Sequence, residues 1–322
     1  MGKLKISEAS IMSKALEGNA PGDPVERAIT SIEYNANEET PVIIGLAGFY
    51  GTSFSFLNRS FTSIDFKSTL EKIASTGKVD SFVIILPDTM TSFGGNQYMN
   101  SSAVGMYEDF ITHDVVDFIK NKYGKRRICL FGKSSGGLGS YNLSINNPEL
   151  FRGFIDVSGD AGFEYCYMRD FPQAIDTLGK TGLTEFMKKF RTSDFHTNSD
   201  LNVNGVIAMS AFYSPDRSGE MGIELPFDMH TGELKEDVWK KWKKLDPLQN
   251  ARSHIKDLKK MKIILQTGSR DEFSINIGMR GLSNILHDNG VDHQFMEYDA
   301  GHFGIDYFYE ESLPELINGL IH

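Results

Sequence analysis

Apolar residues gather in short continuous runs along this chain, and most runs are followed by a segment with helical spacing. A continuous run such as 42–46 predicts a strand buried on both faces, whereas alternation would indicate one exposed face. The pattern predicts two extended segments in the first 35 residues, strands at 41–47, 81–87, 127–131, 153–158, 261–266 and 293–298, and helices at 66–75, 104–123, 135–146, 275–289 and 307–321. Strands that alternate with helices predict a mostly parallel central sheet covered by helices on both faces.

This alternation stops between residues 160 and 259, where the chain is polar and irregular with scattered aromatic residues. The apolar run 205–209 predicts one strand there, and the lysines around Trp239 and Trp242 indicate an exposed helix face with both indoles turned inward. We therefore predict a single α/β domain over residues 1–322, with a cap-like insertion at 160–259 on the C-terminal side of the sheet, where ligands usually bind.

Composition narrows the choice of partners. Lys and Arg number 33 against 43 Asp and Glu, a formal net charge of −10, so nucleic acid is not an expected partner. No run approaches the ~20 apolar residues of a membrane helix, and the first residues lack the apolar core of a signal peptide. We expect a cytoplasmic protein without a membrane partner. Cys129 and Cys166 are too few for a disulfide framework and are expected to be buried free thiols.

The strongest chemical signal is a G-x-S-x-G pattern, which runs from Gly132 to Gly136 with Ser134 at its centre. A predicted strand precedes it and a predicted helix follows it. In that setting a serine lies on a strained turn with its hydroxyl exposed at the edge of a sheet, and flanking glycines avoid collisions with the neighbouring strand and helix. A phosphate-binding loop would need glycine at position 127, which is Arg127. A plain glycine-rich turn is the remaining alternative.

A nucleophilic serine needs a base and an acid, which in this architecture follow it in the order acid, histidine. Asp271 follows the predicted strand 261–266, and His302 follows the strand 293–298 in a glycine-flanked loop. His302 is the one of eight histidines with this placement. Glu272 is a rival to Asp271, although we favour the aspartate. The sequence thus predicts a Ser134, Asp271, His302 triad.

An acyl-transfer reaction also needs two N–H donors for its oxyanion. We expect the amides of Ser135, next to the nucleophile, and of Phe49, in the loop after the early strand, with Tyr50 as the fallback. Tyr50, Tyr98, Asn100 and Trp239 are candidate substrate contacts. In addition, the insertion offers aromatic residues as candidate walls of the pocket: Phe163, Tyr165, Phe212, Tyr213 and Trp239. No metal-ligand spacing is present, so neither a metal nor another cofactor is expected.

At this point the chain resembles the "putative esterase" branch of the α/β-hydrolases, which includes esterase D, enterochelin esterase-like proteins and the antigen 85 acyltransferases. The similar stretches are LAGFYGT (46–52), LPDTMTSFGGNQYMNS (86–101), YEDFI (107–111), GKSSGGLGSYNLSINNPELFRGF (132–154), AFYSPD (211–216), PFDMHTGEL (226–234) and DAGHF (299–303). The resemblance implies an α/β-hydrolase fold and a serine esterase that uses the residues above. Ala47 and Lys133 stand where the family often has other residues, which affects substrate preference rather than mechanism.

The resulting hypothesis is a serine carboxylic-ester hydrolase that acts through an acyl-enzyme on small or short-chain acyl esters. Two alternatives stay open: an acyltransferase on the same scaffold, and a non-catalytic binding protein with a hydrolase fold. The sequence does not determine the natural substrate or the oligomeric state.

Overall fold

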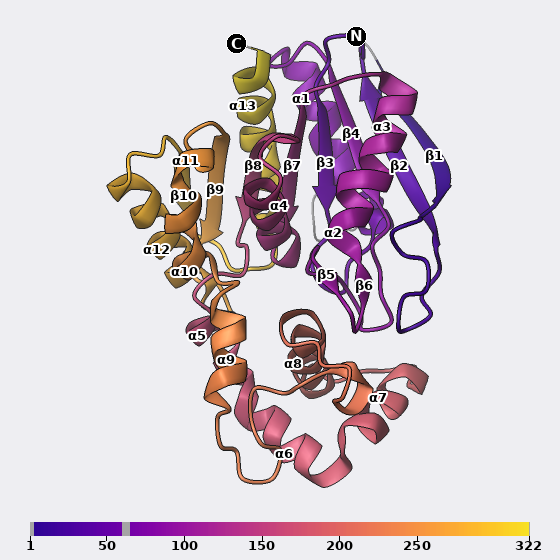
Figure 1. The fold of residues 1–322 in the computed structure, drawn as a ribbon. Coiled ribbons are helices and arrows are strands. Elements are labelled where there is room, and N and C mark those ends of the chain that lie inside the picture. The colour runs from indigo at the N-terminus through magenta and orange to yellow at the C-terminus, as the bar shows by residue number, and fades with distance from the viewer. Residues whose placement is uncertain (1–2, 60–64, 322) are drawn as a thin grey trace.

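The computed structural model describes residues 3–59 and 65–321, and an eight-stranded sheet lies at its centre (Figure 1). The strand order is β1-β2-β4-β3-β7-β8-β9-β10. The edge strand β1 pairs antiparallel with β2, and β2 pairs antiparallel with β4, while every pair from β4 to β10 is parallel. The strands are β1 (Lys5–Met12), β2 (Glu26–Tyr34), β3 (Val42–Leu46), β4 (Phe82–Pro87), β7 (Ile128–Lys133), β8 (Phe151–Val157), β9 (Lys262–Gly268) and β10 (Gln294–Tyr298).

The central strands are buried on both faces, as their continuous apolar runs predict. Neighbouring residues of β3 belong to different hydrophobic clusters: Ile43 packs with α1 and α13, and Ile44 with α3, α4 and α12 on the opposite face. The helices on the two faces are α1 (Phe66–Thr76), α3 (Val116–Tyr123), α4 (Ser135–Asn146), α12 (Ile275–Asp288) and α13 (Tyr309–Ile321). This doubly covered, mostly parallel sheet confirms the predicted fold class.

The helix expected at 104–123 begins later. Residues Asn100–Ser101 (β5) and Gly105–Met106 (β6) form a short antiparallel hairpin, which Gly105 permits with a φ of 150°. Helical structure starts with α2 (Tyr107–Asp109) and continues through a π-helical stretch, Phe110–Val115, into α3. The apolar spacing of 104–123 does not reveal the hairpin because Val104 is buried in the same cluster as the helix.

The insertion between β8 and β9 is helical, and α6, α7, α8 and α9 lie beyond the C-terminal edge of the sheet (Figure 1). Its helices are α5 (Phe163–Cys166), α6 (Phe171–Thr181), α7 (Leu183–Thr192), α8 (Asn198–Tyr213), α9 (Glu236–Lys243), α10 (Pro247–Asn250) and α11 (Ile255–Leu258). Short 3-10 helices accompany them at Met168–Asp170, Glu220–Gly222 and Ala251–His254.

The strand predicted at 205–209 is wrong, because this run lies inside helix α8. Thr197 caps that helix with a capping box, and ten residues from Val203 to Tyr213 are buried. A short apolar run without clear periodicity cannot distinguish a buried strand from a buried helix. By contrast, α9 agrees with its prediction, since Trp239 and Trp242 are 3% and 0% exposed while its lysines face outward.

Three further features concern the cysteines, membrane-spanning helices and clusters of metal-binding side chains. Cys129 and Cys166 are both buried and unpaired. Over residues 3–59 and 65–321, no helix has the length and apolar character needed to cross a bilayer. Within the same ranges, no group of three or more His, Cys, Asp or Glu side chains could hold a metal ion.

Candidate active site

Ser134 lies between the end of β7 and the start of α4, with φ 57° and ψ −126°. A positive φ is strained for a residue with a side chain, and the surrounding backbone holds it in place. The Ser134 N–H donates to the carbonyl of Val157 at 2.9 Å, and its carbonyl accepts from the amides of Gly137 and Leu138 at 2.8 and 3.0 Å. The turn therefore presents the Ser134 side chain at the C-terminal edge of the sheet.

The two glycines of the motif allow this turn to be tight. A Cβ at Gly132 would come within 2.2 Å of the Gly136 carbonyl oxygen, and a Cβ at Gly136 within 2.1 Å of the Leu46 carbonyl oxygen. Gly48 packs from the other side, where a Cβ would lie 3.6 Å from the Cβ of Ser134. These close approaches bring the loop after β3 against the Ser134 turn.

Asp271 and His302 meet at the same edge of the sheet. The Nδ1 atom of His302 lies 2.7 Å from Oδ2 of Asp271, and both residues are buried. The other oxygen of Asp271 accepts from the amides of Phe273 and Ile275 at 2.9 and 3.4 Å. Burial raises the pKa of Asp271, but the hydrogen bond and charge of His302 together with these amides lower it further, so the net shift is downward. The carboxylate thus stays charged beside the imidazole.

Glu272 takes a different position. Its carboxylate accepts the backbone N–H of His302 rather than a ring N–H. The His302 ring also packs against Phe273 in an edge-to-face arrangement, with ring centroids 4.8 Å apart. Asp271 therefore fixes the tautomer of the imidazole. The next two residues in the chain, Glu272 and Phe273, hold the loop that carries His302.

Ser134 and His302 line one cavity of about 330 Å³. Within the described residues, no hydrogen bond joins the Ser134 hydroxyl to the His302 ring. Such contacts between nucleophile and base are often long before substrate binds and tighten in the complex. The three residues of the predicted triad are thus brought to one edge, two of them in contact and two in a shared cavity.

The backbone N–H groups of Phe49 and Tyr50, the two candidates for one oxyanion donor, differ in whether they are already hydrogen-bonded. The Tyr50 N–H donates to the carbonyl of Gly94 at 2.9 Å, so it is already engaged. In the part of the chain that the structure describes, the amides of Phe49 and Ser135 have no acceptor. Gly48, Phe49 and Ser134 border the same cavity. The free N–H groups are therefore those of Phe49 and Ser135, which leaves Tyr50 out.

The walls of this cavity come from segments that the sequence patterns did not single out. They belong to the 3-10 helix Ser53–Leu57, the start of α1, and the stretch from Phe303 through the 3-10 helix Ile305–Phe308 to Tyr309. Next to Ser134 in the chain, Lys133 Nζ lies 3.1 Å from Asp306 Oδ2 and over the ring of Phe303. These segments follow β3 and β10, so their place at the C-terminal edge was the signal that could have identified them.

None of the residues suggested as substrate contacts lines this cavity. The Tyr50 hydroxyl donates to the Leu201 carbonyl of α8 at 2.9 Å, and the Tyr98 hydroxyl donates to the Ala47 carbonyl at 2.6 Å. Asn100 donates to Asp109, and Trp239 packs on Phe171 inside the insertion.

The suggested aromatic walls also lie elsewhere. Phe163, Phe212 and Tyr213 are buried, and Tyr165 is exposed, but none of them borders the cavity. Hydrophobic packing inside the insertion determines the position of the buried rings, as the stacking of Phe163 on Tyr213 illustrates.

A buried carboxyl group, Asp160, lies behind the Ser134 turn, and the sequence reasoning missed it. Its Oδ2 accepts from the Tyr167 hydroxyl at 2.7 Å and the Gln97 amide at 3.3 Å, and lies 3.5 Å from the Ser135 hydroxyl. Burial raises the pKa of Asp160, and the charge of Asp271 adds to the rise. The hydrogen bonds from Tyr167 and Gln97 and the charge of His302 act in the opposite direction, but the net shift is upward. Asp160 is thus a second acid in electrostatic contact with the imidazole, and its position after β8 at the same edge was the available signal.

The fold and this arrangement define an α/β-hydrolase: a mostly parallel sheet with a serine on a strand-to-helix turn and a histidine–aspartate pair on later loops. The chain belongs to the family described as "Putative esterase", whose model matches residues 26–316.

Solved structures share this fold. A ferulic acid esterase is 17% identical with a TM-score of 0.61, and the match covers 100% of both chains. An S-formylglutathione hydrolase from Staphylococcus aureus is 11% identical with a TM-score of 0.54, covering 99% of this chain and 100% of that one. A fluorophosphonate-binding serine hydrolase, also from Staphylococcus aureus, is 12% identical with a TM-score of 0.56 over 100% of both chains.

Among curated proteins, an uncharacterized protein of Corynebacterium glutamicum is 25% identical over 228 residues. The match covers 64% of this chain and 51% of that protein, so it spans about half of the relative's length.

Proposed function

We propose that this esterase-family protein is a serine carboxylic-ester hydrolase that works through an acyl-enzyme. The observation that carries the proposal is the 2.7 Å contact between His302 and Asp271 at the cavity that also holds the strained Ser134. A histidine oriented by a buried carboxylate is the base that a serine hydroxyl requires, since the hydroxyl alone is not ionised at neutral pH.

In the first half of the reaction, Oγ of Ser134 attacks the ester carbonyl while Nε2 of His302 takes the hydroxyl proton. The carbonyl oxygen becomes an oxyanion, which the free amides of Phe49 and Ser135 would stabilise. The tetrahedral intermediate then breaks its bond to the alkoxy oxygen. The departing alcohol takes the proton from His302, and the acyl group remains on Ser134.

In the second half, water donates a proton to His302 and attacks the acyl-enzyme. The resulting intermediate releases Oγ of Ser134, which recovers its proton from His302, and a carboxylic acid leaves. Asp271 stays ionised throughout and stabilises the imidazolium that forms in each half.

The size of the cavity supports small or short-chain acyl esters. Its volume of about 330 Å³ is near the lower end of the range for small-molecule sites. Apolar rings of Phe56, Phe66 and Tyr309 line one part of it, and the Lys133–Asp306 ion pair lines another. The structural neighbours named as ferulic acid esterase and S-formylglutathione hydrolase also support an ester substrate.

The test uses two independent measurements on the full chain. A fluorophosphonate probe should label wild-type protein once and should not label Ser134→Ala. Turnover of p-nitrophenyl acetate should fall in the same variant by at least about 10³-fold. Ser75→Ala, which alters an exposed serine of α1 outside the cavity, should retain both properties. Equal labelling and turnover of Ser134→Ala and wild type would exclude the serine mechanism, and analysis of products with added alcohols would distinguish hydrolysis from acyl transfer.

A further inference from the structure

The insertion does not line the cavity that holds Ser134. Within residues 3–59 and 65–321, none of the residues around that cavity comes from 160–259. Helix α8 of the insertion instead contacts the loop that carries Phe49 and the loop at 91–98, which in turn contacts Ser135. Phe49 and Ser135 are the two expected oxyanion donors, so these contacts indicate what the insertion does for the site.

Tyr50 anchors the loop that carries Phe49. Its backbone has a positive φ of 63°, a strained value for a residue with a side chain, so surrounding contacts must hold it. The Tyr50 N–H donates to the Gly94 carbonyl at 2.9 Å, and its hydroxyl donates to the Leu201 carbonyl of α8 at 2.9 Å. Both ends of Tyr50 are therefore anchored, and this residue directly follows Phe49 in the chain.

Asn204 of α8 joins this loop to the loop at 91–98. Its side-chain amide donates to the Tyr50 hydroxyl at 3.1 Å and to the Phe93 carbonyl at 2.8 Å, and the residue is completely buried. The two loops are in direct contact beside it, because a Cβ at Gly94 would lie 2.8 Å from the Tyr50 ring. A single amide group of the insertion thus holds both loops together.

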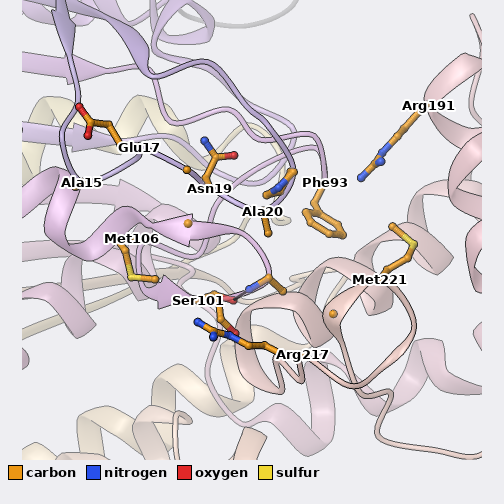
Figure 2. A pocket seen from close by; sticks show the side chains of 16 residues that line it. Ala15, Glu17, Asn19, Ala20, Phe93, Ser101, Met106, Arg191, Arg217 and Met221 are labelled. Atoms are coloured by element: carbon orange, nitrogen blue, oxygen red, sulfur yellow. Dashed lines mark hydrogen bonds between the residues drawn. The ribbon is translucent and has the colours of Figure 1, made fainter.

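Helix α7 contacts the same loop at Phe93. Arg191, in the last turn of α7, has its guanidinium carbon 5.6 Å from the centroid of the Phe93 ring, and its side chain donates to the Ser92 hydroxyl at 3.5 Å. Figure 2 shows Arg191 directed toward Phe93, and both residues border a second cavity, of about 700 Å³. Because Arg191 is exposed, we attribute most of the positioning to the buried Asn204.

The other expected donor, Ser135, is held by the same loop. The side-chain amide of Gln97 donates to the Ser135 hydroxyl at 2.8 Å and lies 2.9 Å from Sδ of Met209 in α8. Gln97 is completely buried, and its amide also lies 3.3 Å from Oδ2 of Asp160. Through this loop, α8 therefore supports both expected oxyanion donors.

We propose that helix α8 positions the oxyanion site and that Asn204 is its main positioning residue. Asn204 does not line the Ser134 cavity, so it acts through Tyr50 on the Phe49 amide. This role rests on the proposed function, because an oxyanion forms only if Ser134 attacks a carbonyl. Loss of one oxyanion donor costs about 10²–10³-fold in kcat, and a donor whose direction is no longer fixed should cost part of that factor.

The test compares Asn204→Leu with Asn202→Leu. Leucine branches at the same carbon as asparagine but has no donor, so Asn204→Leu removes both hydrogen bonds to the loops. Asn202 lies in the same helix, and its amide donates to Gln173 of α6 at 3.2 Å instead, which makes Asn202→Leu the matched control. A fluorophosphonate counts the reactive Ser134 in each sample, so that kcat for p-nitrophenyl acetate is expressed per reactive serine.

Asn204→Leu should lower this kcat by at least about tenfold with KM within about threefold, because the lost interaction acts in the transition state. The inhibition constant of phenylboronic acid, whose tetrahedral adduct on serine resembles the intermediate, should rise by a similar factor. The acidic limb of the pH–rate profile should stay in place, because the contact between His302 and Asp271 is untouched. Asn202→Leu should remain within about twofold of wild type in every measurement.

Tyr50→Phe tests the same role if Asn204→Leu does not fold. It removes one hydroxyl from an exposed side chain and should lower kcat per reactive serine by at least about threefold. Where both variants fold, the double variant should lose less than the product of the two single losses, since the two residues share a hydrogen bond.

Unchanged kcat and boronic acid affinity in Asn204→Leu, or in Tyr50→Phe where Asn204→Leu does not fold, would overturn the proposal, and so would an equal loss in Asn202→Leu. A lower melting temperature with unchanged kcat per reactive serine would leave Asn204 a purely structural role. Wild-type protein that neither reacts with the fluorophosphonate nor hydrolyses the ester would reject the proposed hydrolysis itself, so the two failures are distinguishable.

Discussion

Replacing Asp156 with asparagine should stabilise the protein, and the gain should increase with pH. Asp156 lies in the middle of the sheet, where β8 pairs Asp156 with Gly132 of β7 and Leu265 of β9, and it is 1% exposed. Its Oδ1 accepts the N–H of Gly159 at 2.7 Å. A Cβ at Gly137 would lie 2.3 Å from the same oxygen, so the carboxyl group occupies a slot that glycine leaves open.

This environment raises the pKa of Asp156 from its ordinary 3.8 to about 7. Burial is the main cause, the Gly159 amide acts in the opposite direction, and the charge of Asp160 adds to the rise. A carboxyl whose pKa is higher in the folded chain favours folding while it is protonated, and that contribution is lost as pH rises toward the folded pKa. Ionised Asp156 therefore destabilises the native state near and above neutral pH.

The magnitude follows from the two pKa values. Compared with a side chain that stays protonated, ionisation of Asp156 lowers the free energy of unfolding by about 1.7 kcal/mol at about pH 5 and by about 4 kcal/mol at about pH 8. Asparagine keeps the oxygen that accepts from Gly159 and cannot ionise. The free energy of unfolding of Asp156→Asn relative to wild type should therefore rise by about 2.5 kcal/mol between these pH values.

Urea denaturation at the two pH values, followed by circular dichroism, measures this difference. Asp237→Asn is the matched control, because the Asp237 side chain is 96% exposed and should give the same difference at both pH values. If Asp156→Asn behaves like the control, or if its advantage shrinks with rising pH, the burial argument is wrong.

The other predictions concern the candidate active site. Asp271→Asn should lower kcat for p-nitrophenyl acetate by about 10³–10⁴-fold without loss of fold, because it removes the carboxylate that orients His302. Gly136→Ala should abolish activity and destabilise the fold. By contrast, Gly205→Ala should stabilise the folded protein by about 0.5–1 kcal/mol, because a Cβ at this position of α8 meets nothing within 4 Å. Thermal melts of the two variants measure the difference.

Much of the sheet could be predicted because its signal is local. A run such as Val42–Leu46 has no polar position that could face water, so it needs cover on both sides wherever it folds. The same is true of the Ser134 turn: Gly132 and Gly136 flank a serine between a strand and a helix, and their spacing identifies the turn without any distant contact.

Other features depended on partners that are distant along the chain. The run at 205–209 is part of helix α8, which is buried among the other helices of the insertion and the sheet domain. A helix buried in this way lacks the periodicity of apolar residues that distinguishes a helix from a strand. Asp271 and Glu272 are equally acidic in sequence. In the folded chain the two carboxylates contact different atoms of His302. Asp271 contacts the ring, and Glu272 accepts the backbone N–H.

The sequence by itself determined which segments are buried and where the chain must turn sharply, because those properties belong to neighbouring residues. Only the tertiary structure decided what surrounds Ser134: the cavity walls from residues 53–57 and 303–309, and the buried Asp160. These groups are far apart along the chain, and the direction of each side chain depends on how the elements pack against one another.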